Sequence, residues 1–326
     1  MKAIAYASGG PPEVLQLREV ARPTPKYNEV LIRIRATTAT AGDCQTRQSK
    51  APREFRLLGL THSGAMILGQ ELAGEIEAVG RRVTRFRKGD QVIGWSGLRL
   101  GTYAEYRCLP ERGVLFIKPV NMTYEEAATL PVGGLDAVNL LRRANIQRGE
   151  SVLVNGAGGS MGTYAVQIAK VLGAEVTGVD STTKLDMLRS IGADHIVDYT
   201  QGDFLQSGET YDVIFDVIGN GSLSDILKRL EPKGRYVTAV PQISQILRWQ
   251  WTAWQSGKKV ILWVPRTVGR HAEDFAFLKH LVEEGSVKAI LDRRFPLQQA
   301  AEAHRYVEGG HKKGHVVIAV VQQQTR

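Results

Sequence analysis

The sequence predicts a two-domain α/β protein, with a β-rich first domain and a second domain built on a doubly wound parallel sheet. The chain has 326 residues, which is more than a typical single domain. Polar and apolar residues alternate in period two within residues 1–122, as in half-buried strands. From about Thr123 onward, short apolar strands alternate with amphipathic helices, which is typical of a parallel sheet.

The first domain, residues 1–122, shows its strand pattern most clearly at three places. Residues 29–35 alternate polar and apolar side chains, and residues 72–80 end a similar run at a glycine turn. The turn at residues 88–90 leads into a third strand at 91–94. These runs predict a mainly antiparallel β domain.

The second domain, residues 123–270, contains six short apolar segments with helical segments between them. Parallel strands need crossovers, and right-handed helical crossovers are the rule. The expected strands are 151–155, 175–179, 195–198, 211–216, 234–240 and 260–264, and the expected helices are 161–172 and 184–191.

The last segment, residues 271–326, begins with a helix at 271–285 and then returns to strand patterns. The apolar run at 316–321 needs strand partners, and we expect it to join the β sheet of the first domain. The first domain is then discontinuous in sequence.

The most informative segment joins the first parallel strand to its helix. Residues 152–162 read Val-Leu-Val-Asn-Gly-Ala-Gly-Gly-Ser-Met-Gly. Glycine lets the backbone approach a pyrophosphate, whose charge is attracted by the N–H groups at the helix start. A strict G-x-G-x-x-G would place its first glycine at Ala157. The strand, the helix and an acidic Asp180 after the next strand nevertheless predict a dinucleotide site.

Residues beyond the second parallel strand leave the choice of nucleotide open. Asp180 lies about 20 positions past the loop, where a carboxylate holds a ribose hydroxyl and repels a 2′-phosphate, which favours NAD. Ser181, Thr182, Lys184 and Tyr199 follow and could instead cradle a 2′-phosphate.

Composition excludes several other classes. Hydrophobic residues make up 43% and charged residues 23%, which is ordinary for a soluble globular protein. Cys44 and Cys108 fit neither a disulfide framework nor a zinc clip, so we expect a reducing, cytoplasmic setting. No run reaches roughly 18–20 apolar residues, and the N-terminus lacks a signal-peptide pattern. The net charge of +9 is scattered, which favours solubility and a phosphorylated ligand over nucleic acid.

Seven motifs follow one another along nearly the whole chain, at residues 10–15, 68–74, 88–92, 101–106, 157–162, 216–219 and 314–318. They include Gly10-Pro11-Pro12-Glu13-Val14-Leu15 and Gly101-Thr102-Tyr103-Ala104-Glu105-Tyr106. Together they resemble the medium-chain dehydrogenase/reductase superfamily, in its zinc-less quinone oxidoreductase-like branch. The resemblance implies a GroES-like catalytic domain, a Rossmann domain, an active site in the cleft between them, and a homodimer.

The resemblance also implies the cofactor contacts. In relatives that use NADPH, a lysine and a tyrosine bind the 2′-phosphate, and Lys184 and Tyr199 fall at those places. NADP(H) is therefore favoured, with NAD(H) tolerated. The expected cofactor-binding residues are Thr129, Gly156, Ala157, Gly158, Gly159, Ser160, Met161, Gly162, Asp180, Ser181, Lys184, Tyr199, Val217, Ala239 and Val240.

No zinc is expected, because two ligand positions of the zinc-dependent alcohol dehydrogenases hold Thr40 and Gln70 here. Both are poor zinc ligands, and the four clustered cysteines of a structural site are missing. Polarisation and protonation of a carbonyl must then come from side chains, backbone N–H groups or water. Thr40, Asp43 and Tyr103 are the candidate catalytic residues from their motif positions, although Tyr103 could be a buried structural tyrosine and Asp43 an ion-pair partner.

The expected reaction is zinc-independent hydride transfer from NAD(P)H to a quinone or enone-type carbonyl substrate. A zinc-less alcohol dehydrogenase or enoyl-thioester reductase is the enzymatic alternative, and a non-catalytic dinucleotide- or RNA-binding protein is the alternative from another class. Neither a membrane nor nucleic acid is expected as a partner. Residues 243–254 hold Trp249, Trp251 and Trp254, which could pack on the sheet or form a pocket wall or dimer surface. Cys44 and His62 are interpreted as packing or loop residues.

Overall fold

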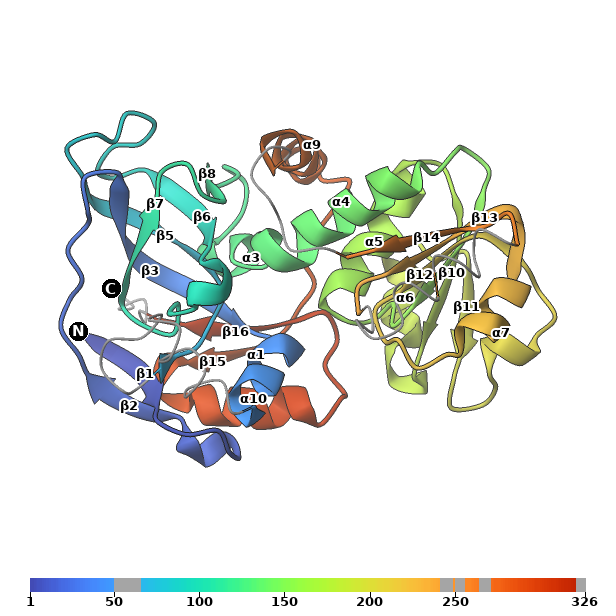
Figure 1. Cartoon of the computed structure of the whole chain (residues 1–326), viewed down its shortest axis with the longest axis horizontal. Helices are drawn as coiled ribbons and strands as arrows, with labels where there is room; N and C mark the ends of the chain where they lie inside the picture. The colour runs from blue at the N-terminus through green and yellow to red at the C-terminus, as the bar shows by residue number, and fades with distance from the viewer. Residues whose placement is uncertain (50–65, 241–248, 250–255, 264–270, 321–326) are drawn as a thin grey trace. The chain divides into compact units, whose positions relative to one another are not determined.

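The computed structural model describes residues 1–49, 66–240, 249, 256–263 and 271–320, and Figure 1 shows their elements. They form two compact units, Met1–Val132 with Ala289–Arg326 and Gly133–Lys288. The first unit is discontinuous, as the apolar run near the C-terminus predicts. The boundaries differ from the expected ones, since residues 123–132 belong to the first unit and the helix after residue 270 belongs to the second.

The first unit is built on a sheet of seven strands, in the order β15-β16-β3-β5-β6-β8, with β7 also paired to β3. A smaller sheet has the order β2-β1-β4. All pairs are antiparallel except β15 with β16. The elements are β1 (Lys2–Tyr6), β2 (Gln16–Glu19), β3 (Glu29–Ala39), α1 (Ala41–Gln48), β4 (Met66–Ile67), β5 (Glu71–Val79), β6 (Gln91–Trp95), β7 (Tyr106–Pro110), β8 (Leu115–Ile117), α3 (Tyr124–Ala127), β15 (Leu291–Pro296), α10 (Ala300–Glu308) and β16 (His315–Ala319).

The C-terminal strand β16 completes the sheet of the first unit. It lies between β15 and β3, with Val316 opposite Ala39 and Ile318 opposite Thr37. Val316, Val317 and Ile318 are fully buried, so both faces of this strand lie in the core. The expectation that the apolar run near residue 316 returns to the first domain is confirmed, and the strand itself ends at Ala319.

The second unit is a six-stranded, entirely parallel sheet in the order β11-β10-β9-β12-β13-β14. Its elements are α4 (Leu135–Ala144), β9 (Ser151–Asn155), α5 (Ser160–Val171), β10 (Glu175–Asp180), α6 (Leu185–Ser190), β11 (His195–Asp198), β12 (Tyr211–Asp216), α7 (Leu223–Lys228), β13 (Leu230–Thr238), β14 (Lys259–Leu262) and α9 (His271–Glu283). The strand order reverses between β9 and β12, and in doubly wound sheets ligands bind at the carboxyl ends of the strands at that point.

A hydrophobic cluster fills one face of this sheet. Leu153, Ile214 and Tyr236 come from its central strands, and Trp249 packs against the Tyr236 ring with centroids 6.2 Å apart. The packing interpretation therefore holds for Trp249, whereas Trp251, Trp254 and His62 lie outside the described residues.

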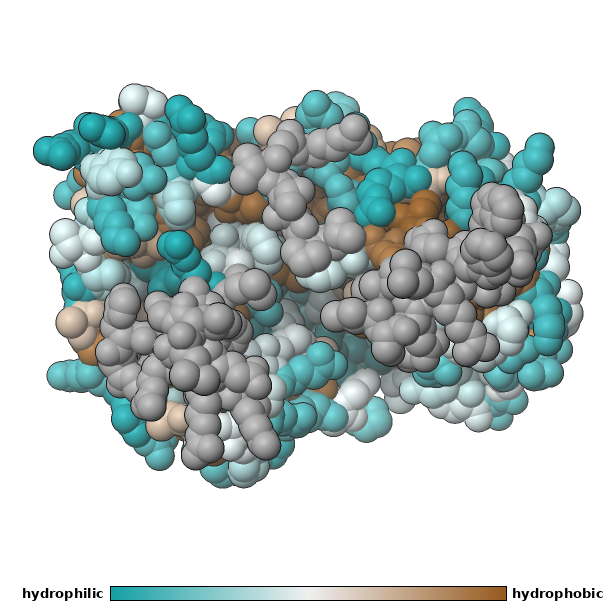
Figure 2. Space-filling model, in the orientation of Figure 1, coloured by the Kyte–Doolittle hydropathy of each residue, from teal (hydrophilic) through white to brown (hydrophobic). Residues whose placement is uncertain are grey.

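The six predicted strands and three predicted helices of residues 151–285 all form, and most ends shift by only one or two residues. β13 is the exception, because it begins at Leu230 rather than at 234. Among the described residues, no helix is long and apolar enough to cross a membrane. Hydrophilic residues are spread over the described surface in the view of Figure 2.

Candidate active site

The loop between β9 and α5 folds back on the carboxyl end of the sheet. The N–H groups of Gly156 and Ala157 both donate to the Val179 carbonyl, at 3.0 and 3.1 Å. Gly156 has φ of +81°, a left-handed conformation that favours glycine. A Cβ on Gly162 would overlap the Gly156 carbonyl oxygen and lie 2.7 Å from that of Ala157. Glycine at these positions therefore brings the helix start directly onto the turn.

Helix α5 begins at this turn with a glycine as its N-cap residue. Its N-cap residue is Gly159, which has no side-chain oxygen to accept from the N–H groups of Ser160, Met161 and Gly162. A helix start of this kind, with its positive dipole end, suits the negative charge of a phosphate. The glycines of the turn and the helix start that follows them fit the pyrophosphate of a dinucleotide.

Asp216 fixes the neighbouring loop, which follows β12. It accepts hydrogen bonds from Asn155 Nδ2 at 3.0 Å and from Tyr236 Oη at 2.8 Å, and its Oδ1 also accepts from the N–H groups of Ile218 and Gly219. A Cβ on Gly156 would lie 2.6 Å from Val217 Cγ2, so the loops after β9 and β12 touch. These loops meet where the strand order reverses.

Asp180 lies at the end of β10 and is turned inward. Its carboxylate accepts from the N–H groups of Gly158 and Ser181, both at 2.8 Å, and forms an ion pair with Lys184 Nζ at 2.9 Å. Asp180 is only 4% exposed and Lys184 only 7%. The Lys184 side chain also crosses Gly158, where a Cβ would lie 2.6 Å from Lys184 Cδ. Asp180, expected at the ribose hydroxyl, and Lys184, expected at the 2′-phosphate, thus neutralise each other's charge.

The remaining expected cofactor residues lie in different environments. Tyr199 follows β11 and is 60% exposed, and its N–H donates to the Asp180 carbonyl. Ala239 and Val240 follow β13, and the Ala239 N–H donates to the Asp216 carbonyl. These residues, with Val217, stand at the carboxyl edge of the parallel sheet. Thr129 is fully buried in the first unit and donates to the Glu126 carbonyl.

In the first unit, Thr40 and Asp43 form one tight pair at the start of α1. Thr40 is the N-cap residue, and its hydroxyl accepts from the Asp43 N–H at 3.1 Å. Asp43 Oδ2 in turn accepts from the Thr40 N–H at 3.0 Å and from its hydroxyl at 2.6 Å. This capping box explains why the sequence turns into a helix here. Thr40 is half-buried, whereas Asp43 is fully buried.

The surroundings of Asp43 favour its neutral form. Burial raises the pKa of Asp43 from the usual 3.8 to about 6, against the hydrogen bonds from the Thr40 hydroxyl and N–H, which lower it. A carboxyl group with a pKa near neutrality can both hold and release a proton under physiological conditions. The half-buried Thr40 hydroxyl is its nearest polar contact.

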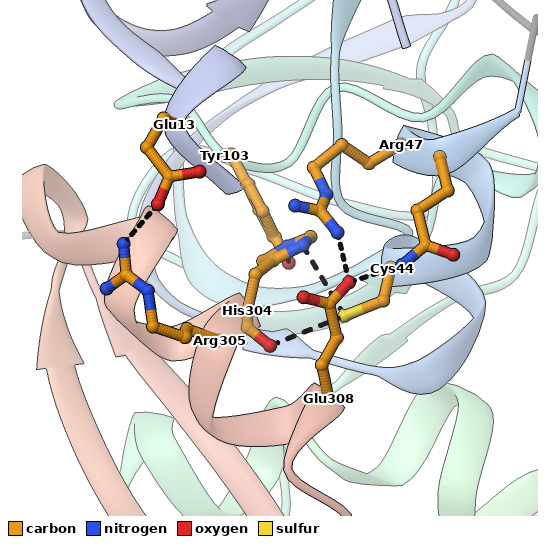
Figure 3. A network of polar contacts seen from close by, with 8 residues as sticks. Glu13, Cys44, Arg47, Tyr103, His304, Arg305 and Glu308 are labelled. Carbon is orange, nitrogen blue, oxygen red and sulfur yellow. Dashed lines mark hydrogen bonds and ion pairs between the residues drawn. The ribbon is translucent and has the colours of Figure 1, made fainter. Parts of the chain in front are cut away.

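Tyr103 is fully buried and contacts His304 of helix α10 (Figure 3). Its hydroxyl lies 3.0 Å from His304 Nε2, and the two rings meet edge to face with centroids 5.7 Å apart. His304 Nδ1 lies 3.5 Å from Cys44 Sγ. Tyr103 therefore contacts internal residues, so its position suits an indirect role better than contact with a substrate.

The residues at the expected ligand positions do not fit zinc. A Cβ on Gly42 would lie 3.6 Å from both Thr40 Oγ1 and Gln70 Nε2, so these two side chains flank one position. A hydroxyl and an amide lack the thiolate or imidazole that zinc prefers. Across the part of the chain that the structure describes, no three His, Cys, Asp or Glu side chains are grouped to hold a metal ion.

Sequence reasoning missed several residues of these clusters. Asn155 and Asp216 could have been found, because each is a polar residue at the carboxyl end of an apolar strand. His304 shares a buried helical face with Ala300, Ala303 and Val307, so its burial was also predictable. Its contact with Tyr103 joins distant parts of the chain, and no local pattern indicates it.

The parallel sheet and its glycine loop are those of a dinucleotide-binding protein. An alcohol dehydrogenase GroES-like domain model matches residues 26–119, and a model described as zinc-binding dehydrogenase matches residues 191–318. The quinone oxidoreductase of Pseudomonas aeruginosa is 32% identical over 97% of this chain and 99% of its own. An NADPH-dependent alkenal/one oxidoreductase, chloroplastic, of Arabidopsis thaliana is 31% identical over 98% of this chain and 79% of its own.

A solved structure of the quinone oxidoreductase from Coxiella burnetii superimposes with a TM-score of 0.88 at 28% identity, covering 98% of this chain and 99% of that one. The chain belongs to the medium-chain dehydrogenase/reductase superfamily, in its quinone oxidoreductase-like branch. These findings confirm three expectations from the sequence. The chain is a member of this family, it combines a GroES-like unit with a Rossmann unit, and it is an NAD(P)H-dependent oxidoreductase.

Proposed function

We propose that the chain is a zinc-independent reductase that uses NADPH in preference to NADH and acts on quinones or enone-type carbonyl compounds. The two relatives, an alkenal/one oxidoreductase and a quinone oxidoreductase, support this substrate class. The observation that carries the proposal is the Thr40–Asp43 pair, which places a proton donor where zinc-dependent relatives hold a metal ligand.

The preference for NADPH rests on the charges around Asp180. A free carboxylate would repel a 2′-phosphate, but the ion pair with Lys184 and the two N–H donors neutralise Asp180. Ser181 and the exposed Tyr199 add polar groups at the same edge of the sheet. We propose that Gly156–Gly162 hold the pyrophosphate and that Ser181, Lys184 and Tyr199 accommodate the 2′-phosphate, with Thr129, Asp180, Val217, Ala239 and Val240 as the other contacts.

Bound NADPH supplies the hydride, and Thr40 and Asp43 supply the proton that completes the reduction. Protonated Asp43 donates to Thr40 Oγ1 while the Thr40 hydroxyl proton passes to the substrate, so one proton leaves the carboxyl group in each turnover. Solvent then returns a proton to Asp43 through Thr40. Thr40 is the catalytic residue in this scheme, and Asp43 is its proton source.

Turnover by chelator-treated protein tests this proposal. NADPH and NADH are first titrated by fluorescence, and each is then oxidised with a quinone and with an enone. We expect metal-free turnover, tighter binding of NADPH, and an enone rate that falls as the pH rises through about 6, since Asp43 must be protonated.

Two variants make the test specific. Thr40→Ser keeps the hydroxyl and should retain activity, whereas Thr40→Val should lose about 10²-fold or more in kcat, the size of a lost general acid. Full activity of Thr40→Val would overturn the relay, and activity only with added zinc would overturn zinc independence. Retention of RNA without turnover would favour the non-catalytic alternative.

The cytoplasmic location and the homodimer stay predictions from the sequence and the family resemblance. Light scattering of the purified protein, together with fractionation of the source cells, measures both.

A further inference from the structure

Asp216 is a buried acidic residue beside the glycine loop. It is the last residue of β12 and is only 1% exposed. Its Oδ1 accepts from the N–H groups of Ile218 and Gly219, at 2.9 and 3.0 Å, and from Asn155 Nδ2 at 3.0 Å. Its Oδ2 accepts from Tyr236 Oη at 2.8 Å. Both oxygens of the carboxyl group therefore act as acceptors.

These donors favour a charged carboxylate and leave its charge uncompensated. Hydrogen bonds to an ionised carboxylate stabilise its charge, and all the donors to Asp216 are neutral groups. Among the residues that the structure describes, no lysine, arginine or histidine forms an ion pair with Asp216. Asp180, at the end of β10, differs because Lys184 Nζ lies 2.9 Å from its carboxylate. At the carboxyl edge of the sheet, the negative charge at β10 is thus compensated and that at β12 is not.

The place of β12 in the sheet decides which part of a dinucleotide this charge acts on. In doubly wound sheets a dinucleotide crosses the point where the strand order reverses, with its pyrophosphate at the glycine loop and its adenosine ribose near the carboxylate after the next strand. Here the loop follows β9, and that carboxylate is Asp180 on β10. We therefore expect the other half of the dinucleotide, which ends in the nicotinamide, on the side of β12 and β13.

A negative charge on this side distinguishes the two forms of the cofactor. Bound NADPH gives up a hydride, which is one proton with two electrons, and its neutral ring becomes the positively charged ring of NADP⁺. The Asp216 carboxylate attracts that positive charge, and burial strengthens the attraction because little water screens it. The same carboxylate has little effect on the neutral ring.

We propose that the ionised carboxylate of Asp216 favours the oxidised form of the bound cofactor, because it attracts the positive charge of NADP⁺ and not the neutral ring of NADPH. Asp216 then makes bound NADPH a stronger hydride donor, in addition to fixing the loop after β12. The inference rests on the proposed function, because it deepens the role of the proposed dinucleotide site.

Isothermal titration calorimetry of the full-length protein with NADP⁺ and with NADPH measures this effect. The readout is the Kd for NADP⁺ divided by the Kd for NADPH, and the phosphate groups common to both nucleotides cancel in this ratio. Asp216→Asn should raise the ratio about 4- to 17-fold, the effect of two unit charges about 10 Å apart at an effective dielectric constant of about 20 to 40. The new amide keeps an oxygen for the three N–H donors and offers an N–H to Tyr236 Oη, so we expect the loop to stay in place.

Two further variants separate charge from loop geometry. Asp198→Asn is the matched control, because Asp198 ends β11, three strands from β12, and accepts from the hydroxyls of Thr182 and Thr200. It should change both Kd values by the same factor and leave the ratio unchanged. Tyr236→Phe keeps the Asp216 charge and removes one of its donors, so the ratio should stay at or below the wild-type value.

The outcomes distinguish this inference from the proposed function. An unchanged ratio in a folded Asp216→Asn protein would show that Asp216 only holds the loop, and the inference fails while dinucleotide binding stands. If the wild type binds neither nucleotide, the proposed function itself fails. If Asp216→Asn does not fold, Tyr236→Phe decides the inference alone, and a ratio above the wild-type value would overturn it.

Discussion

The buried carboxyl group of Asp43 should leave a distinct signature in the pH dependence of stability. Its pKa is about 6 in the folded protein and 3.8 when unfolded, so the folded state keeps a proton that the unfolded state releases. The contribution is fully present below pH 3.8 and is lost as the pH rises through 6. Ionisation therefore costs the folded state about 3 kcal/mol, at about 1.4 kcal/mol per pH unit.

The Asp43→Asn variant removes this contribution. Urea unfolding at pH 3.5 and pH 7.5 should show the wild type losing about 3 kcal/mol relative to Asp43→Asn across this interval. Asp225 is the matched control, since Ser222 and Lys228 lower its pKa and the wild type should gain stability relative to Asp225→Asn as the pH rises. Parallel stability profiles for wild type and Asp43→Asn would contradict the buried-carboxyl interpretation.

Individual site residues show what a sequence can and cannot predict. The positions of Asp180 and Lys184 follow from the strand and its spacing to the glycine loop. Their ion pair could also have been predicted, because side chains four residues apart often meet at a helix start. The contact between Tyr103 and His304 could not, since it joins two segments that are 201 positions apart in the sequence. Only the folded sheet brings them together.

The turn between β9 and α5 offers a test at the level of a structural element. Alanine is favoured over glycine within a helix by about 1 kcal/mol, so helix propensity alone predicts that Gly162→Ala stabilises the protein. The new Cβ would instead collide with the carbonyl oxygen of Gly156 and lie 2.7 Å from that of Ala157. Such overpacking costs about 1–3 kcal/mol. We expect the loop to move, because both atoms belong to the backbone.

Displacement of this loop should weaken nucleotide binding. If the strain appears as lost binding, Gly162→Ala raises the Kd for NADPH about 5- to 150-fold, which fluorescence titration measures. Gly202→Ala is the control, because a Cβ there meets no atom within 4 Å, and its Kd should equal that of the wild type. Wild-type affinity in Gly162→Ala would show that close approach of α5 to the turn is unnecessary.

At the scale of the whole chain, local sequence patterns predict where strands form better than they predict where one unit ends and the next begins. The apolar runs at residues 151–155 and 211–216 predict parallel strands, and both form at those bounds. The unit boundary at Val132 and Gly133 lies within the helical segment Leu130–Gly134, so no change from strand to helix pattern marks it in the sequence. The return of the chain end was predictable for a simple physical reason, since the apolar run near residue 316 cannot stay exposed.

This return makes the first unit depend on the last strand of the chain. A protein that ends at Gly314 lacks β16, whose Val316, Val317 and Ile318 are fully buried between β15 and β3. Each contributes about 2 kcal/mol, so the loss of about 6 kcal/mol matches the net stability of many domains. Limited proteolysis with mass spectrometry should digest the first unit and leave a fragment near residues 133–288. A chain ending at Val320 keeps every described strand and should resist digestion, whereas resistance of the Gly314 protein would show that the first unit folds without β16.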